Sequence, residues 1–310
     1  MRLRKEEECV VLAVVARKGG VGKTFVALNT AINAAMGGPH KSEKPLKVLF
    51  IDVDSQQNSS YFFLKSTGAS VLGQRVLLPP NADCDQNNIY TIADVFAGNE
   101  FMEYATDYSN IHIIPSDGNI DDLRSISPNA DAVNDDSLTK VSVMQFQGLI
   151  ELVKDDYDLI VIDTPPSKTH ASQGAIAAAT HCLVVTTPDS YNAEIAVPGI
   201  VADIKNNNER FRQSYNHAEI SGIIFNKISS TNPTKHEQQH FENIKSAFPE
   251  LTNNRPYFCN YVAFNTEIPQ SPNNFDWMKH NKAKGQMEKF YEFVRTKVVN
   301  KIYEEANKND

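Results

Sequence analysis

The sequence predicts an α/β fold in which a mostly parallel, twisted sheet carries helices on both faces. Three observations predict it: short apolar, β-branched runs recur along the 310 residues, helical patterns lie between them, and a glycine-rich turn joins the first run to the first helical pattern. Continuous apolar runs suit strands that are buried on both faces. Regular alternation of strand and helix is typical of a parallel sheet.

The elements follow one another in a regular order. The predicted strands are Val10–Val15, Val48–Ile51, Ile111–Ile114, Leu159–Ile162, Leu183–Thr187 and Ile220–Phe225. The predicted helices are Gly22–Met36, Ser142–Lys154, Ala193–Asn207, His236–Ala247 and a last helix over 282–306. Polar segments near 37–46, 66–88 and 127–137 are interpreted as loop insertions. No linker divides the sequence, so residues 1–310 are expected to form a single domain.

Composition narrows the function classes. The formal net charge is −8, so the surface as a whole does not attract nucleic acid. No apolar run approaches the roughly 18 residues that span a bilayer. The cysteines are far apart and form no C-x-x-C pair, which argues against a zinc site or a disulfide framework and favours a cytoplasmic location: Cys9, Cys84, Cys182 and Cys259.

The stretch "VVARKGGVGKTF" carries the strongest chemical signal. A Gly-x-x-x-x-Gly-Lys-[Ser/Thr] loop holds phosphates, because its backbone N–H groups point inward and a helix begins where it ends. Here the loop follows a predicted strand and opens a predicted helix. Lys23 is predicted to reach the β and γ phosphates, and Thr24 to place its hydroxyl on Mg²⁺. The position of the usual first glycine is held by Arg17.

Carboxylates end two of the predicted strands. Asp52 and Asp54 close "VLFIDVD", and Asp163 closes "YDLIVID". Ligands bind beyond the carboxyl ends of the strands in open parallel sheets, so these acids are expected to face the phosphate loop. Phosphoryl transfer needs Mg²⁺ and a group that places the attacking water, and carboxylates serve both needs.

The K-G-G-x-G-K-T form and the acidic motifs resemble the deviant Walker A P-loop ATPases of the ParA/MinD family, over roughly residues 10 to 230. The resemblance implies a P-loop NTPase fold that binds ATP and Mg²⁺. It implies that Lys23 serves its own nucleotide while Lys18 reaches the nucleotide of a second subunit. It also implies that Asp163 holds Mg²⁺, usually through a water, that Asp54 helps to position the lytic water, and that Asp52 lies further from the magnesium. The predicted nucleotide contacts are Lys18, Gly19, Gly20, Val21, Gly22, Lys23, Thr24 and Phe25.

The resemblance implies two further residues near the adenine base. The sequence also departs from the family motif at two places. The resemblance implies that Asn226 pairs with adenine, whose edge suits an amide, and that Pro269 belongs to the loop covering the base. Relatives commonly carry a second threonine where this sequence has Phe25, so one α-phosphate contact is missing. The common D-x-D-P-Q-G-N reads Asp-Val-Asp-Ser-Gln-Gln-Asn over 52–58, which changes the freedom of that turn.

Within the family, the sequence favours a ParA-type partition ATPase that forms a homodimer on ATP and hydrolyses it slowly. Only about 15 residues precede the loop, so no separate N-terminal DNA-binding domain is expected. Seven Lys and Arg stand against two Glu over 279–301, and this cluster is the candidate patch for non-specific DNA. A solvated helix face explains it equally well. The resemblance further implies stimulation by a ParB-type, centromere-binding adaptor and, if DNA is bound, association with the nucleoid.

Three alternatives remain open. A MinD-like, membrane-associated positioning ATPase needs a basic amphipathic C-terminal helix. The apolar stripe over 287–302 is interrupted by Lys297 and Lys301 and is interpreted as core packing, so no stable membrane association is expected. An iron–sulfur relative needs paired cysteines, which the sequence lacks. A small-molecule ligase or kinase would need an acceptor site, and no motif indicates one.

Overall fold

A computed structural model describes residues 9–38, 44–64, 70–71, 74–75, 90–126, 134–189, 191–211, 217–226, 234–249 and 259–262. Within them an eight-stranded sheet has the order β10-β9-β8-β1-β7-β2-β6-β5. All neighbouring strands are parallel except β5 and β6. The strands are β1 (Val10–Val15), β2 (Val48–Asp52), β5 (Tyr104–Ala105), β6 (Ile111–Ile114), β7 (Leu159–Asp163), β8 (His181–Thr186), β9 (Glu219–Asn226) and β10 (Cys259–Val262). A separate antiparallel pair joins β3 (Ser70–Val71) to β4 (Gln74–Arg75).

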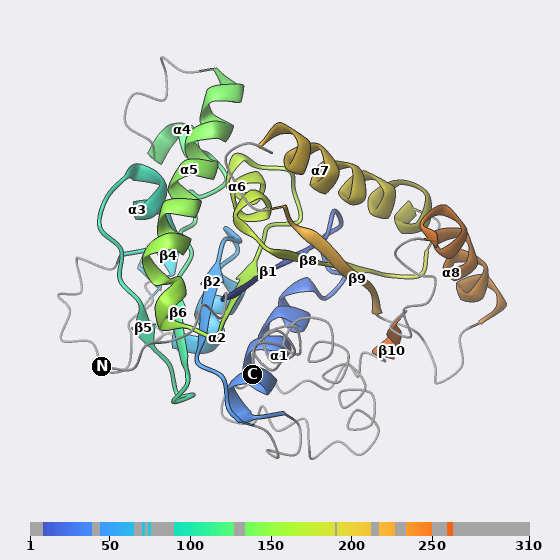
Figure 1. Cartoon of the computed structure of the whole chain (residues 1–310), viewed down its shortest axis with the longest axis horizontal. Coiled ribbons are helices and arrows are strands. Elements are labelled where there is room, and N and C mark those ends of the chain that lie inside the picture. The colour runs from blue at the N-terminus through green and yellow to red at the C-terminus, as the bar shows by residue number, and fades with distance from the viewer. Residues whose placement is uncertain are drawn as a thin grey trace, which may run out of the picture.

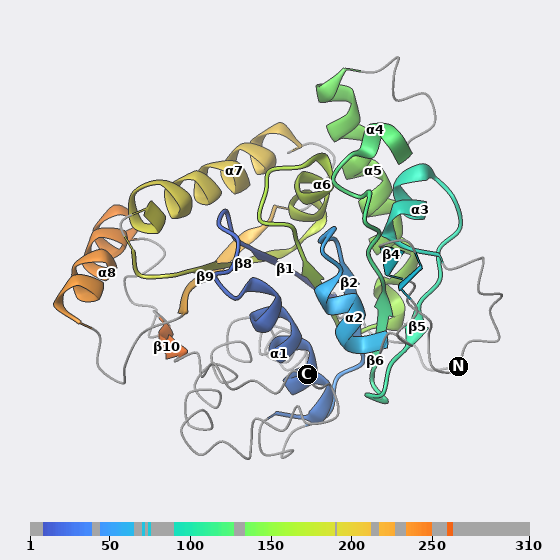
Figure 2. The same cartoon turned by 180° about the vertical axis from the view of Figure 1, so that it is seen from behind.

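Helices cover both faces of the sheet, as the sequence predicts (Figures 1 and 2). One face packs against α1 (Lys23–Met36) and α2 (Asn58–Leu64). The other packs against α3 (Ile92–Ala97), α4 (Leu123–Ile126), α5 (Asp135–Val153), α6 (His170–Ala178), α7 (Val197–Arg210) and α8 (Lys235–Ala247). The predicted fold class, a mostly parallel sheet between two helical layers, is confirmed.

The central strand β1 is apolar at every position because helices cover both faces of the sheet. Val11, Ala13 and Val15 belong to the core under α5, α6 and α7, whereas Leu12 and Val14 belong to the core under α1. Successive side chains of a strand point to opposite faces, so both sets are apolar and all six residues are buried. Because β1 lies between β7 and β8, the loop that follows it emerges at the middle of the sheet edge.

The start of α5 corrects the sequence prediction, which placed this helix at Ser142 and a loop insertion over 127–137. The helix begins at Asp135, and the Asn134 side chain accepts a hydrogen bond from the N–H of Ser137 at 2.9 Å. Asp135 and Asp136 in the first turn favour a helix N-terminus electrostatically. Asp135 and Asp136 therefore belong to the helix start and not to a loop, and residues 127–133 lie outside the described residues. The helix predicted over 282–306 and most of the insertion near 66–88 lie outside the described residues, and the single domain stays a prediction.

Candidate nucleotide-binding site

The glycine-rich loop between β1 and α1 has open space around Gly19 and Gly20. Gly20 and Gly22 have φ of 74° and 91°, in the left-handed region that favours glycine. No heavy atom lies within 4 Å of the position that a Cβ would take on Gly19 or Gly20. Gly22 is the N-cap of α1 and provides no side-chain cap. The open loop and the N-terminal end of the helix dipole together suit a phosphate group.

Lys23 lies buried beneath this loop and contacts two of the predicted acids. Its Nζ is 2.6 Å from Asp163 Oδ1 and 3.6 Å from Asp54 Oδ2, and its side chain is 6% exposed. Burial alone would lower the pKa of Lys23, but Asp163, Asp54 and Asp52 outweigh burial and raise it. Lys23 is therefore charged and held where phosphates would replace carboxylates as its partners.

The register of the sheet brings Asp52 and Asp163 together. They are paired residues at the ends of β2 and β7, and both are fully buried. Asp163 Oδ2 accepts a hydrogen bond from Ser59 Oγ at 2.8 Å. Asp52 Oδ2 accepts from the N–H and hydroxyl of Ser60 at 2.8 and 2.7 Å, and its Oδ1 accepts from the N–H of Asp54 at 3.0 Å. Asp52 thus fixes the start of α2, and its role near magnesium stays a prediction.

The pKa of Asp52 leads to a prediction on stability. Burial first, and then the Asp163 carboxylate, raise the pKa of Asp52 from 3.8 to about 7. Since the folded pKa is above the unfolded one, the stability from this group is fully present below the unfolded pKa and is lost as the pH rises through 7. Between pH 4 and pH 7 we expect wild type to lose a few kcal/mol relative to Asp52→Asn, which cannot titrate there. Urea unfolding across that range measures it, and a pH-independent difference would contradict it.

Asp54 is held by the turn that connects β2 to α2. Its Oδ1 accepts from the N–H of Gln56 at 3.0 Å, and its backbone carbonyl accepts from the N–H of Gln57 at 2.8 Å. Gln57 has φ of 55°, the left-handed conformation that costs a side-chain-bearing residue roughly 1–2 kcal/mol. Gln57 stands where the common family motif has glycine. The turn thus keeps a glycine conformation although the glycine has been replaced.

Lys18 lies apart from Lys23 and faces outward. Its Nζ is 3.2 Å from Asp189 Oδ2 and 5.8 Å from the centre of the Tyr191 ring, and its side chain is 44% exposed. Partial burial would raise the pKa of Asp189, but hydrogen bonds from Thr187, Asn192 and Lys18 lower it to about 2. Lys18 therefore contacts an ionised carboxylate of its own chain and remains accessible from outside.

The other predicted contacts surround the loop. Asn226, at the end of β9, is fully buried and donates its Nδ2 to the Val21 carbonyl at 2.8 Å. It supports the loop in this arrangement, and its pairing with adenine stays a prediction. Phe25 is partly buried and packs against the core between the sheet and α1. Thr24 follows Lys23 in the first turn of α1.

Two predicted features lie outside the described residues, and two residues that contact the site were not predicted. Pro269 and the basic cluster over 279–301 lie outside the described residues. Sequence reasoning missed Ser59, which holds Asp163, and Asp189, which holds Lys18. The signal for Asp189 was present, since it follows a predicted strand at the same edge of the sheet.

Comparisons with known proteins identify the family of the chain. A family profile described as an AAA domain matches residues 9–217. A virulence plasmid ParA family protein from Chlamydia psittaci is 29% identical over 228 residues, 72% of each chain. The septum site-determining protein MinD from Synechocystis is 28% identical over 179 residues, 58% of this chain and 53% of that protein.

Solved structures show the same fold. A McdA variant from Cyanothece in complex with ATP superposes with a TM-score of 0.70 at 16% identity and covers 93% of this chain and 96% of its own. At that identity the likeness concerns the fold alone. Taken with the family profile and the ParA and MinD relatives, it leads to one conclusion: the chain belongs to the AAA domain family and is a P-loop ATPase of the ParA/MinD type.

Proposed function

We propose that this chain is a ParA-type partition ATPase that binds ATP with Mg²⁺, dimerises around the nucleotide and binds DNA without reading its sequence. The observation that carries the proposal is the separation of the two lysines. Lys23 is buried against Asp163, whereas Lys18 is exposed on the same loop. A ParA family protein stands among the relatives, which supports the partition role.

The residues present fit ATP and magnesium. The open space at Gly19 and Gly20 leaves room for phosphates, to which the backbone N–H groups of the loop and the Lys23 ammonium would donate. Thr24 and Asp163 are the residues that would hold Mg²⁺, with Asp52 behind Asp163. When bound, Mg²⁺ neutralises part of the phosphate charge. Asp54, beside Lys23, is the group that would place the water.

Lys18 and its surroundings support dimerisation. Tyr191, whose ring lies 5.8 Å from Lys18 Nζ, is 47% exposed, and Ile195 in the following helical turn is 55% exposed. A second copy on this surface would bury both of them. The Lys18 ammonium could then leave Asp189 and contact the nucleotide that the second copy binds. Two nucleotides that meet at an interface repel each other, and one lysine from each side would offset that repulsion.

One experiment tests the dimer and the DNA together. Sedimentation with ATP is expected to give a dimer, which pellets with random-sequence DNA at low salt and separates from it at higher salt. ADP is the matched control, and it should leave a monomer. A monomer with ATP under all conditions would exclude the proposal. Adding a ParB-type adaptor should raise the slow basal turnover.

DNA binding is expected to fall steeply with salt. With about four phosphate contacts per dimer, log K should change with log salt at a slope of about −3.6. Reversing the charges of Lys282, Lys284 and Lys289 should weaken every DNA sequence equally, because only phosphates are contacted. Fluorescence anisotropy with two unrelated duplexes measures this. Binding that survives the triple reversal would place the DNA contact elsewhere.

Asp54→Ala is expected to keep ATP binding and lower hydrolysis by about 10²-fold or more, because the attacking water would lose the group that places it. The dimer should then accumulate, because turnover no longer releases it. A phosphate-release assay with gel filtration checks both parts. Asp117→Ala, which removes a half-buried carboxylate in the loop after β6, is the matched control. Unchanged turnover in Asp54→Ala would remove this carboxylate from the reaction.

The MinD relative supports a second candidate, a membrane-associated positioning ATPase. In the part of the chain that is described, no helix combines the length and the apolar character needed to cross a bilayer. A peripheral C-terminal helix would act differently, by lying in the bilayer surface. Flotation with anionic vesicles and ATP decides between the two candidates: binding to vesicles but not to DNA would favour the second.

A further inference from the structure

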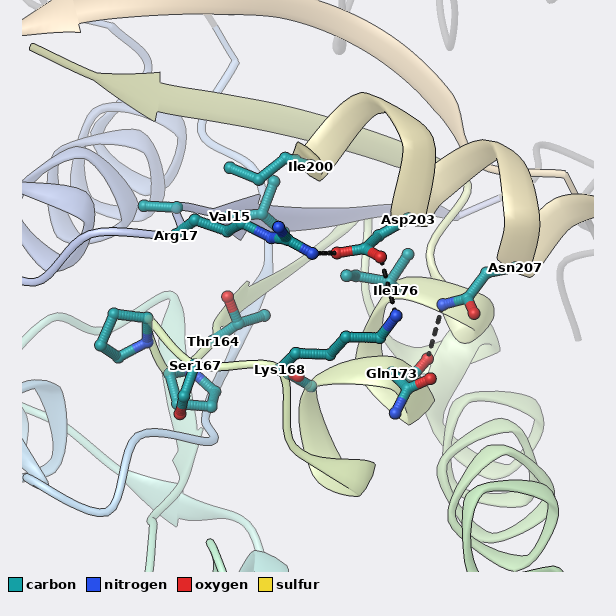
Figure 3. Close-up of a pocket in the computed structure, with 14 residues that line it drawn as sticks. Val15, Arg17, Thr164, Ser167, Lys168, Gln173, Ile176, Ile200, Asp203 and Asn207 are labelled. Atoms are coloured by element: carbon teal, nitrogen blue, oxygen red, sulfur yellow. Dashed lines mark hydrogen bonds and ion pairs between the residues drawn. The ribbon is translucent and has the colours of Figure 1, made fainter. Parts of the chain in front are cut away.

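Arg17 stands where the usual phosphate loop has its first glycine, and its side chain extends to α7. Its Nη2 lies 2.5 Å from Asp203 Oδ2 (Figure 3). The side chain of Asp203 is only 17% exposed, and that of Arg17 is 35% exposed. The residue directly before Lys18 is thus tied to a helix on the sheet face opposite α1.

The same carboxylate holds a second cation from another loop. Lys168 Nζ lies 2.8 Å from Asp203 Oδ1, so each carboxylate oxygen serves one cation (Figure 3). Lys168 belongs to the segment that follows Asp163 at the end of β7. That segment also contacts β1, since Thr164 Oγ1 donates to the Val14 carbonyl at 2.8 Å. Asp203 therefore joins the two loops that border the proposed nucleotide site.

Asp203 is the shielded member of this contact, whereas the Lys168 side chain is 51% exposed. A Cβ on Gly199 would overlap the Arg17 guanidinium, so the glycine leaves room for Arg17 against α7. Beneath the three charged groups, a pocket has an apolar floor that includes Val15, Ile176 and Ile200. The apolar floor and the shielding of Asp203 favour the two ion pairs, while both cations reach the solvent.

We propose that Asp203 is a positioning residue, which fixes the phosphate loop relative to the segment after Asp163 by holding Arg17 and Lys168 together. Neighbouring residues Arg17 and Lys18 contact different acids, Asp203 and Asp189. Anchoring Arg17 to α7 thereby sets the direction in which Lys18 leaves the loop. Its effect on turnover rests on the proposed ATPase function, whereas its effect on loop order does not.

Three variants release the loop in different ways. Arg17→Gln removes one cation, Asp203→Asn removes the shared charge, and Gly199→Ala displaces the guanidinium without changing any charge. Alanine also favours helix over glycine, so Gly199→Ala separates loop release from loss of helix stability. Arg210→Gln is the matched control, because Arg210 pairs α7 with Asp136 at the other end of the same helix.

Amide hydrogen exchange in nucleotide-free protein is the direct readout. We expect exchange at residues 16–22 and 164–169 to become about fivefold faster or more in all three variants, the lower end of typical coupling between sites. Arg210→Gln should leave these peptides unchanged, and the thermal midpoint of Gly199→Ala should not fall. Unchanged exchange in the three variants, or an equal increase in the control, would overturn the proposal.

Kinetics give the second readout. In the three variants kcat should fall at least severalfold while KM for ATP stays near wild type, because the phosphate contacts remain and only their placement against Asp54 and Asp163 changes. Arg17→Gln combined with Asp203→Asn should cost less than the two single effects together. Additive losses would overturn the shared contact. A wild-type chain without turnover would reject the ATPase proposal and leave the exchange result to decide on Asp203.

Discussion

Lys23→Ala is expected to abolish ATP binding. Lys23 is the buried lysine beneath the glycine loop, 2.6 Å from Asp163, and its pKa is raised by the neighbouring acids. Its removal takes away the ammonium that would meet the β and γ phosphates. Buried carboxylates at Asp54 and Asp163 would then face the same phosphates with no cation between them. The effect on binding therefore combines a lost attraction with an added repulsion, and isothermal calorimetry should detect no heat of binding.

The variant should also lose stability, by about 3–5 kcal/mol, because breaking a buried ion pair leaves charge uncompensated. Combining Lys23→Ala with Asp163→Asn removes one of those charges. Part of the stability should then return, whereas ATP binding should not. Lys140→Ala removes an exposed lysine paired with Asp136 and should alter neither property. Near wild-type affinity in folded Lys23→Ala protein would show that the glycine loop is not the phosphate site.

The strands were predictable because burial on both faces decides their composition. β1 coincides with the predicted Val10–Val15, and β7 extends the predicted run only by Asp163. β7 ends in a polar residue, so the apolar pattern stops one residue before the strand does. Likewise, β2 ends at Asp52 and β9 at Asn226.

Helices were harder to predict where packing replaces periodicity. α6 (His170–Ala178) was missed because it is rich in alanine and lacks an apolar stripe, and nearly all of it is buried. It fits tightly against α5: a Cβ on Gly174 would overlap the Ser142 hydroxyl. A small residue at such a contact carries no local signal, because its role depends on a helix about 30 residues away.

The candidate site was predictable to the extent that it lies at strand ends. The meeting of Lys23, Asp54 and Asp163 follows from the order of the strands, and the spacing of the motif indicated it. The contact of Ser59 with Asp163 and that of Arg17 with Asp203 depend on how α2 and α7 pack. At Gln57 the motif misleads in another way: the glycine of the common motif is absent, yet the turn keeps the left-handed backbone conformation that favours glycine.

Lys18→Ala is expected to keep ATP binding nearly intact while losing the ATP dimer and most of the hydrolysis. Lys23 already occupies the inner side of the loop, so a second ammonium acts best from across an interface. Lys18 is 44% exposed and contacts Asp189 at 3.2 Å and the Tyr191 ring, so it can exchange these partners for a nucleotide. Arginine should not rescue fully, because a planar guanidinium differs in shape from a compact ammonium. Calorimetry, sedimentation and phosphate release measure the three properties separately.

Two further experiments separate action across the interface from action within one chain. Asp189→Asn breaks the Lys18–Asp189 pair but keeps the lysine, so it should preserve the dimer if Lys18 acts on the partner's nucleotide. Mixing Lys18→Ala with Lys23→Ala supplies the second test. In the mixed dimer, the nucleotide bound by the Lys18→Ala chain still meets an intact Lys18 from the other chain, and some activity should return. If heterodimers form and stay as inactive as either variant alone, Lys18 acts within its own chain. Loss of the dimer in Asp189→Asn would also indicate that Lys18 acts within its own chain. The Lys18–Asp189 pair, and not the lysine alone, would then support the interface.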